Sequence, residues 1–180
     1  DIALELYPGI GPVCDLCTGS GAVAFALARN LPAGTAIDAV DLSEQALAYA
    51  RRNRDILGCT NVTLYRGDLF APVPSDRLYS LVTANPPYVS PEEYGALPED
   101  VSNHEPKEAL WADEGGLALV RRIARDARLR LADRGRLVCE IGSRQGRATA
   151  TILSRAGYVD VEIRPDLTGR DRIAVARMPC

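Results

Sequence analysis

The stretch from Val13 to Asn30 constrains the fold more than any other part of the chain. Its apolar residues 13–17 read as a short buried strand, Thr18-Gly19-Ser20-Gly21 as a turn, and residues 22–30 as a helix. A strand, a glycine turn and a helix in this order form half of a βαβ nucleotide-binding unit. Glycines in the turn let the backbone pass close to a ligand, and the helix start directs free N–H groups towards it.

The glycine turn does not by itself identify the ligand. A dinucleotide-binding fingerprint has a third glycine where this chain has Ala24, and a P-loop requires a Gly-Lys-Ser/Thr that does not follow the turn. Cys14-x-x-Cys17 has zinc or redox spacing, but no second cysteine pair or histidine cluster completes a metal site. We therefore expect no metal.

The rest of the chain continues to alternate between strands and helices. Further strands are predicted at 35–40, 62–65, 78–84, 135–141, 159–163 and 172–177, and further helices at 44–57, 116–131 and 145–156. Residues 2–6 resemble the end of a helix, and Ser43 and Gly58 are suited to begin and end the 44–57 helix. The pattern predicts an α/β fold, doubly wound, with a mostly parallel seven-stranded sheet, helices on both faces and an antiparallel last strand.

Composition indicates a globular chain. Its 180 residues suit one domain, and no apolar run approaches the roughly 18 residues that a membrane span needs. The N-terminus does not resemble a signal peptide, so we expect a cytoplasmic protein. We also expect a monomer. The five cysteines are an odd number and three lie in apolar strand-like segments, which predicts no disulfide framework. A net charge of −3 with interspersed arginines argues against a large nucleic-acid footprint.

Acidic residues follow the next two predicted strands. Asp41, with Leu42 beside it, lies about 20 residues beyond the glycine turn, where a carboxylate typically accepts both hydroxyls of an adenosine ribose. Asp68 and Leu69 end the third strand and suit the amino group and ring face of adenine. Each acid alone fits a solvated strand end or a helix cap equally well. Features at three adjacent strand ends together favour an adenosine ligand.

The tetrapeptide Asn85-Pro86-Pro87-Tyr88 follows the fourth predicted strand. Its prolines fix φ at two positions and leave the Pro86 carbonyl beside the Asn85 side chain with no following N–H to occupy it. Two neighbouring acceptors suit a planar NH2 group, because each takes one hydrogen and leaves the nitrogen facing the group to be transferred. The alternative interpretation is a proline-rich turn.

Other polar residues allow more than one interpretation. Residues 90–115 hold three prolines and several acids, which is typical of a lid, a binding segment or a disordered loop. Within them His104, the only histidine, suits a lid or structural role better than a base. Glu140 is either a substrate contact or hydrogen-bonded in the core. The remaining predictions concern arginines: Arg121, Arg122, Arg125 and Arg128 as a solvated helix face, and Arg170 and Arg172 as anchors of the last hairpin.

Four motifs together resemble the class I methyltransferases that use S-adenosylmethionine. They are Asp15-Leu16-Cys17-Thr18-Gly19-Ser20-Gly21, Val40-Asp41-Leu42-Ser43, Gly67-Asp68-Leu69-Phe70 and Asn85-Pro86-Pro87-Tyr88. Blocks further along resemble, more narrowly, the HemK/PrmC family, glutamine N5-methyltransferases that modify peptide chain release factors. These blocks are His104-Glu105-Pro106, Gly115-Gly116-Leu117, Glu140-Ile141-Gly142 with Gln145-Gly146, and Asp166-Leu167-Thr168-Gly169-Arg170-Asp171-Arg172.

The resemblance implies a Rossmann-like catalytic domain over residues 1–180. It implies methyl transfer from S-adenosylmethionine to a glutamine side-chain nitrogen, most simply of a release factor, with S-adenosylhomocysteine as product and no metal or strong general base. The implied cofactor contacts are Asp15, Thr18, Gly19, Gly21, Asp41, Leu42, Asp68, Leu69 and Asn85. The implied catalytic residues are Asn85, Pro86, Pro87 and Tyr88, and Asn85, Pro86, Tyr88 and Glu105 are implied to bind the substrate.

Departures from the family pattern and two other functions accompany this resemblance. Family members carry an N-terminal helical domain that helps to dock the release factor and is absent from these 180 residues, and Cys17 stands where glycine is common. One other function is methylation of an exocyclic amine of a nucleic-acid base, adenine N6 or guanine N2, but the expected recognition segment or basic stripe is missing. The other is a non-catalytic adenosine-binding module that recruits a partner through residues 90–115.

Overall fold

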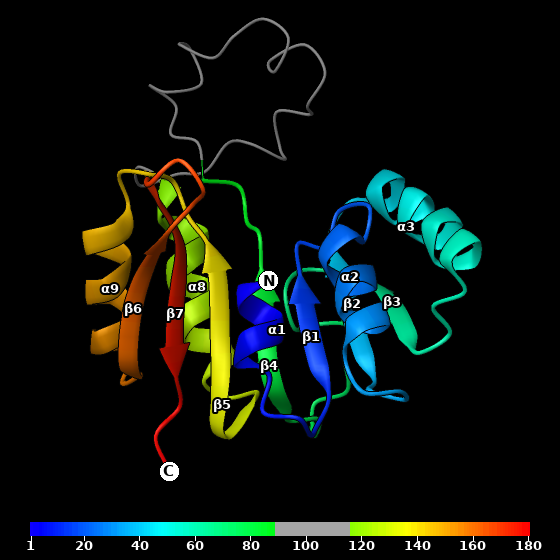
Figure 1. Cartoon of the computed structure of the whole chain (residues 1–180), viewed down its shortest axis with the longest axis horizontal. Helices are drawn as coiled ribbons and strands as arrows, with labels where there is room; N and C mark the ends of the chain where they lie inside the picture. Colours follow the sequence, from blue (N-terminus) through cyan, green and yellow to red (C-terminus); the bar gives the residue numbers. More distant parts are fainter. Residues whose placement is uncertain (89–115) are drawn as a thin grey trace, which may run out of the picture.

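One mixed sheet organises the fold (Figure 1). The computed structural model describes residues 1–88 and 116–180, so Glu105, His104 and the predicted 90–115 segment lie outside it. The sheet order is β3-β2-β1-β4-β5-β7-β6, with β1 to β5 paired in parallel and β7 antiparallel to both of its neighbours. The strands are β1 (Val13–Leu16), β2 (Ile37–Asp41), β3 (Val62–Arg66), β4 (Tyr79–Ala84), β5 (Leu131–Glu140), β6 (Val159–Pro165) and β7 (Asp171–Arg177).

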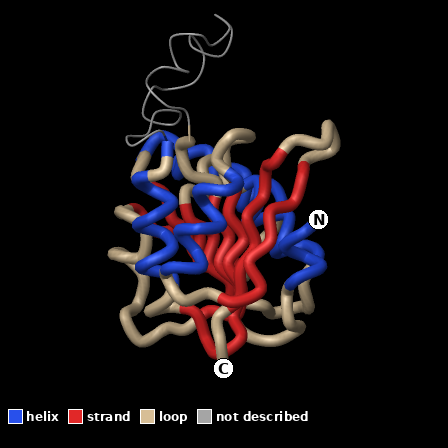
Figure 2. Tube along the Cα trace, turned by 90° about the vertical axis from the view of Figure 1, so that its left-hand side faces the viewer, coloured by secondary structure: helices blue, strands red, loops and turns tan. Residues whose placement is uncertain are grey.

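Helices cover both faces of this sheet, as Figure 2 shows end-on. They are α1 (Ile2–Leu6), α2 (Ala22–Asn30), α3 (Glu44–Leu57), α8 (Ala118–Ala127) and α9 (Gly146–Arg155). Alternate strand residues point to opposite faces: Val13 belongs to the apolar cluster that includes α1, α2 and α3, whereas Cys14 belongs to the cluster that includes α8 and α9. The predicted doubly wound α/β fold is therefore confirmed.

Local signals placed several element ends correctly. The Ser43 side chain accepts a hydrogen bond from the Ala46 N–H at 3.2 Å and caps α3, and Gly58 ends that helix in the left-handed conformation with φ 65°. All five cysteines are free, as predicted. Of those in the predicted strand segments, Cys14 and Cys139 are buried and Cys17 is half-buried, and Cys59, after α3, is also buried. Within residues 1–88 and 116–180, the structure has no helix both long and apolar enough to cross a membrane.

The region around residues 128–135 differs from the prediction. A helix was expected over 116–131 and a strand over 135–141, but α8 ends at Ala127 and β5 already begins at Leu131. Leu131 is paired with Tyr79, and the register then shifts before the next pair, Leu81 with Arg136. Leu131 continues the helical apolar spacing, but its burial is due to its place on the strand. The hairpin strand β7 is also inserted between β5 and β6, a position that no local pattern indicated.

A buried carboxylate on β2 joins three parts of this fold. Asp38 is 1% exposed and accepts hydrogen bonds from the Arg77 guanidinium, at 2.6 and 2.8 Å, and from the Tyr79 hydroxyl at 2.7 Å. The Asp38 carboxylate raises the pKa of Arg77. Because Tyr79 is fully buried on β4, its hydroxyl has no access to solvent if Asp38 is removed.

We expect Asp38→Ala to lower the free energy of unfolding by about 1–3 kcal/mol, the usual penalty for leaving a buried donor unsatisfied. Asp76, which is exposed, provides the control, since Asp76→Ala is expected to change stability by less than about 0.5 kcal/mol. Urea unfolding of both variants measures the difference. Equal stability of the two variants would show that Tyr79 finds another partner.

Candidate active site

The carboxyl ends of five neighbouring strands lie along one edge of the sheet (Figure 1). From β3 to β5, this edge presents Asp68, Asp41, the glycine turn after β1, Asn85 and Glu140. Backbone hydrogen bonds hold the ends together, from the Thr18 N–H to the Val40 carbonyl and from the Asn85 N–H to the Leu16 carbonyl. The structure therefore brings together the predicted site residues that it describes.

Asp15 supports the glycine turn from the protein interior. Its carboxylate is 2% exposed and accepts hydrogen bonds from the hydroxyls of Thr18, at 2.5 Å, and Thr83, at 2.6 Å. Burial nevertheless raises the pKa of Asp15 to about 6, because desolvation disfavours the charged form. The side chains of Asp15 and Thr18 thus hold the turn from behind, and their contribution to cofactor binding stays a prediction.

Left-handed backbone conformations shape the turn itself. Gly19 and Gly21 have φ of 57° and 85°, and Cys17 also has a positive φ, 54°. This conformation explains why glycine suits the position that Cys17 holds. A Cβ on Gly21 would lie 2.1 Å from the Phe25 ring, whereas a Cβ on Gly19 would meet nothing within 4 Å. The turn is therefore packed against α2 at Gly21 and open at Gly19, where a ligand has room to approach.

Asp41 holds the turn from the neighbouring strand. One carboxylate oxygen accepts the Gly19 N–H at 2.7 Å, and the other accepts the Ser43 N–H at 2.8 Å. Each oxygen keeps a further lone pair, so the Asp41 carboxylate can still accept hydrogen bonds from two hydroxyl groups. Leu42 is 70% exposed and offers apolar surface beside them. This combination fits a ribose and an attached base.

The next strand end holds an ion pair that the sequence did not reveal. Asp68 is exposed, and its carboxylate contacts the Arg122 guanidinium at 2.6 Å. Leu69 has φ 48° and is 6% exposed, so its side chain packs in the core while its backbone follows Asp68 at the edge. The predicted arginine face of α8 is exposed but also links elements, because Arg128 donates to the carbonyl of Ala156, the residue that follows α9.

The predicted acceptor pair lies at the end of β4. Asn85 is exposed, and its side-chain amide makes no hydrogen bond within the part of the chain that the structure describes. Pro86 is buried and Pro87 half-buried, so the two rings fix the loop to the protein. The Asn85 amide is thus held at the edge by its backbone while its side chain remains available to a substrate.

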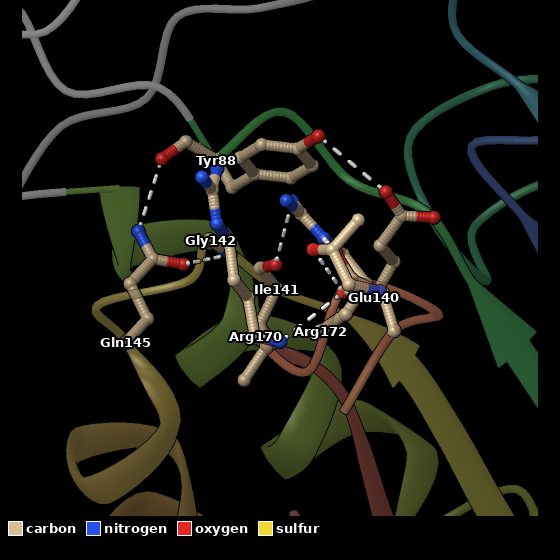
Figure 3. Close-up of polar contacts among 9 residues, drawn as sticks. Tyr88, Glu140, Ile141, Gly142, Gln145, Arg170 and Arg172 are labelled. Carbon is tan, nitrogen blue, oxygen red and sulfur yellow. Dashed lines mark hydrogen bonds and ion pairs between the residues drawn. The ribbon is translucent and has the colours of Figure 1, made fainter. Parts of the chain in front are cut away.

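Tyr88 is held by partners from two later strands, as Figure 3 shows. Its hydroxyl donates to Glu140 at 3.4 Å, and the Arg172 guanidinium lies 5.5 Å from the centre of its ring. Burial and the Glu140 carboxylate raise the pKa of Tyr88. Glu140 therefore contacts the tetrapeptide, and Arg172, which also pairs with Asp166 at 3.6 Å, anchors the last hairpin as predicted.

Comparison with known proteins shows the family to which the chain belongs. The family described as "Methyltransferase domain" matches residues 13–104, and the chain belongs to this family. Among its relatives, the release factor glutamine methyltransferase of Cereibacter sphaeroides is 44% identical over 179 residues, which cover 99% of this chain and 63% of that protein. The ribosomal protein uL3 glutamine methyltransferase of Bradyrhizobium diazoefficiens is 50% identical over 131 residues, 72% of this chain and 40% of that protein.

These relatives confirm the resemblance to the glutamine methyltransferases of the HemK/PrmC family, and the chain spans less than two thirds of their length. Solved structures support the fold. A methyltransferase from Pyrococcus furiosus has a TM-score of 0.76 at 16% identity and covers 99% of this chain and 81% of its own. An RNA methyltransferase from Salinibacter ruber in complex with S-adenosyl-L-homocysteine has a TM-score of 0.61 at 17% identity, with 99% and 89% covered.

We expect the stability of the wild-type chain, relative to Asp15→Asn, to increase as the pH falls from 6 to 4. Asp15 binds its proton up to about pH 6 in the folded chain but only near its ordinary pKa of 3.8 when unfolded. The folded state therefore binds more protons in this window, and stability is lost as the pH rises through it, by about 3 kcal/mol in total. Denaturant unfolding at several pH values measures the difference, and a pH-independent difference would contradict burial of an ionisable Asp15.

Gly21→Ala is expected to be more destabilising than Gly34→Ala. Both glycines have positive φ, 85° and 83°, for which alanine loses roughly 1–2 kcal/mol, but only Gly21 faces a neighbouring side chain, the Phe25 ring. Thermal unfolding of the two variants isolates the effect of that overlap. Equal losses would show that the Phe25 ring moves aside freely.

Proposed function

We propose that residues 1–180 form the catalytic domain of an enzyme that transfers a methyl group from S-adenosylmethionine to the side-chain nitrogen of a glutamine in a protein, a peptide chain release factor. The observation that carries this proposal is the exposed Asn85 amide, held between the glycine turn and Glu140 at the edge of the sheet. A hydrogen-bond acceptor fixed beside a site that fits an adenosine can orient the NH2 group of a substrate towards the group to be transferred.

The cofactor would be held by residues from three strand ends. The open turn at Gly19 and the Asp41 carboxylate fit the sugar, and Leu42 and the Asp68-Leu69 backbone fit the adenine. When bound, S-adenosylmethionine supplies an electrophilic methyl group on a sulfonium. The acidic groups along this edge favour a positively charged ligand.

The chain's own contribution to the reaction is to orient the substrate nitrogen. A carboxamide nitrogen is a poor nucleophile because its lone pair is delocalised into the carbonyl. Acceptance of its two hydrogens by the Asn85 side chain and the Pro86 carbonyl favours a pyramidal nitrogen and aims its lone pair at the methyl group. Catalysis of this kind depends on positioning and on binding that strengthens in the transition state. The Tyr88 ring, held by Glu140 and Arg172, borders the same position.

The relatives support a protein as substrate. The names of these relatives specify glutamines of release factors or of ribosomal protein uL3, and the release factor enzymes match 89% to 99% of this chain against 71% to 78% for the uL3 enzymes. We therefore place the release factor first. We also propose a monomer as the acting unit and the cytoplasm, where release factors work, as its compartment.

Asn85→Ala is expected to reduce methyl transfer by at least about 100-fold, because the substrate nitrogen loses its orienting acceptor. Binding of S-adenosylhomocysteine is expected to remain within a few-fold of the wild type, as measured by calorimetry. Asn30→Ala, at the exposed end of α2, is the matched control and is expected to keep full activity. Unchanged transfer by Asn85→Ala would contradict the mechanism.

Substrate identity is tested with labelled S-adenosylmethionine and three purified acceptors: a release factor, ribosomal protein uL3, and total RNA. We expect label in the release factor, and its removal when the acceptor glutamine is replaced by alanine. Label in uL3 alone would retain the glutamine chemistry but change the partner. Label in RNA alone would overturn the proposal in favour of base methylation.

A further inference from the structure

Gln145 joins two segments that are distant in the sequence (Figure 3). Its side-chain nitrogen donates to the Tyr88 carbonyl at 3.0 Å, and its side-chain oxygen accepts the Gly142 N–H at 2.8 Å. The residue is 7% exposed and lies at the start of α9. One buried amide group thus connects the end of the Asn-Pro-Pro-Tyr segment to the turn between β5 and α9.

A glutamine is chemically suited to this connection. Its amide both donates and accepts, so it can satisfy a carbonyl and an N–H at the same time, whereas a carboxylate only accepts and a thioether does neither effectively. Gly116 packs against the bond between Gln145 and Tyr88. A Cβ on Gly116 would lie 2.2 Å from both the Gln145 side-chain nitrogen and the Tyr88 carbonyl oxygen. The chain therefore passes close to Gln145 at Tyr88 and again at Gly116.

The backbone of Gln145 is itself fixed. Its N–H donates to the Gly142 carbonyl at 2.9 Å, and its carbonyl accepts the Thr149 N–H at 2.8 Å. The next residue, Gly146, is packed so closely that a Cβ would lie 2.2 Å from a carboxylate oxygen of Asp171 at the start of β7. The clamp that Gln145 forms on Tyr88 is thus anchored in the sheet and in α9.

We propose that Gln145 is a positioning residue that fixes the orientation of Asn85 and Pro86 by clamping the Tyr88 carbonyl. The inference rests on the proposed methyl transfer. At one end of the tetrapeptide the Asn85 N–H is bonded to the Leu16 carbonyl, and at the other end the Tyr88 carbonyl is bonded to Gln145. Because the two prolines between them have fixed φ, holding both ends leaves the acceptor pair few alternative conformations.

The test compares Gln145→Met with Gln45→Met, which changes an exposed glutamine on α3. We expect Gln145→Met to lower kcat for methylation of the release factor on the order of 100-fold, the effect of a displacement of about 1 Å in a reacting group. The affinity for S-adenosylhomocysteine is expected to stay close to that of Gln45→Met, and the melting temperature to fall by only a few degrees, because Gly142 and Tyr88 are half-buried and can bond to water instead. Gln145→Glu keeps the bond to Gly142 but faces the Tyr88 carbonyl with a carboxylate oxygen, so an equal or larger loss of kcat is expected.

Two results would overturn this role. One is an unchanged kcat in Gln145→Met. The other is a loss of kcat accompanied by a similar fold-loss of cofactor affinity and a large drop in melting temperature, which indicates general destabilisation. If the wild-type chain transfers no methyl group to any acceptor, the proposed function fails. Amide hydrogen exchange then tests separately whether Gln145 holds the Asn85–Tyr88 segment in place. Faster exchange at both Gly142 and Asn85 in Gln145→Met than in Gln45→Met supports the clamp. Unchanged exchange at Asn85 contradicts it.

Discussion

The candidate site depends on the hydrogen bonds that the buried carboxylate of Asp15 accepts. One of its oxygens accepts the hydroxyl of Thr18 in the glycine turn, and the other accepts the hydroxyl of Thr83 on β4, two residues before Asn85. The turn proposed to face the cofactor and the strand that carries Asn85 are therefore tied to the same group. Burial of an ionisable side chain is unfavourable, and the donors around Asp15 compensate for it by satisfying both oxygens.

The same edge of the sheet combines rigid backbone with free acceptors. Asp41 uses one lone pair of each oxygen to hold Gly19 and Ser43, and Asn85 uses its backbone N–H to hold its place beside β1. In both cases backbone groups fix the position while side-chain acceptors remain available. A site built in this way needs little reorganisation when a ligand binds, which is the condition under which positioning alone accelerates a reaction.

Sequence reasoning located the parts of the site that depend on local patterns. The carboxyl ends of β1 to β5 lie within one residue of their predicted positions, and the Ser43 cap and the acceptor tetrapeptide lie where predicted, because each is recognisable from a few consecutive residues. The contacts that support them join residues far apart in the chain: Thr83 is 68 positions from Asp15, and Gln145 is 57 positions from Tyr88. A threonine in an apolar strand was the available sign of the first, but its partner depends on the pairing of β1 with β4. No short pattern specifies that pairing.

The Asn85-Pro86 pair does not by itself select a class of substrate, because a glutamine amide and the exocyclic amine of a base both present a planar NH2 group. Selection depends on the surrounding surface, and nucleic acids bind chiefly through cations that contact phosphates. Within residues 1–88 and 116–180, Arg122 and Arg172 contact site residues, and both are paired with carboxylates, Arg122 with Asp68 and Arg172 with Asp166. An arginine engaged in this way is a poor anchor for a phosphate, which is consistent with the proposed protein acceptor.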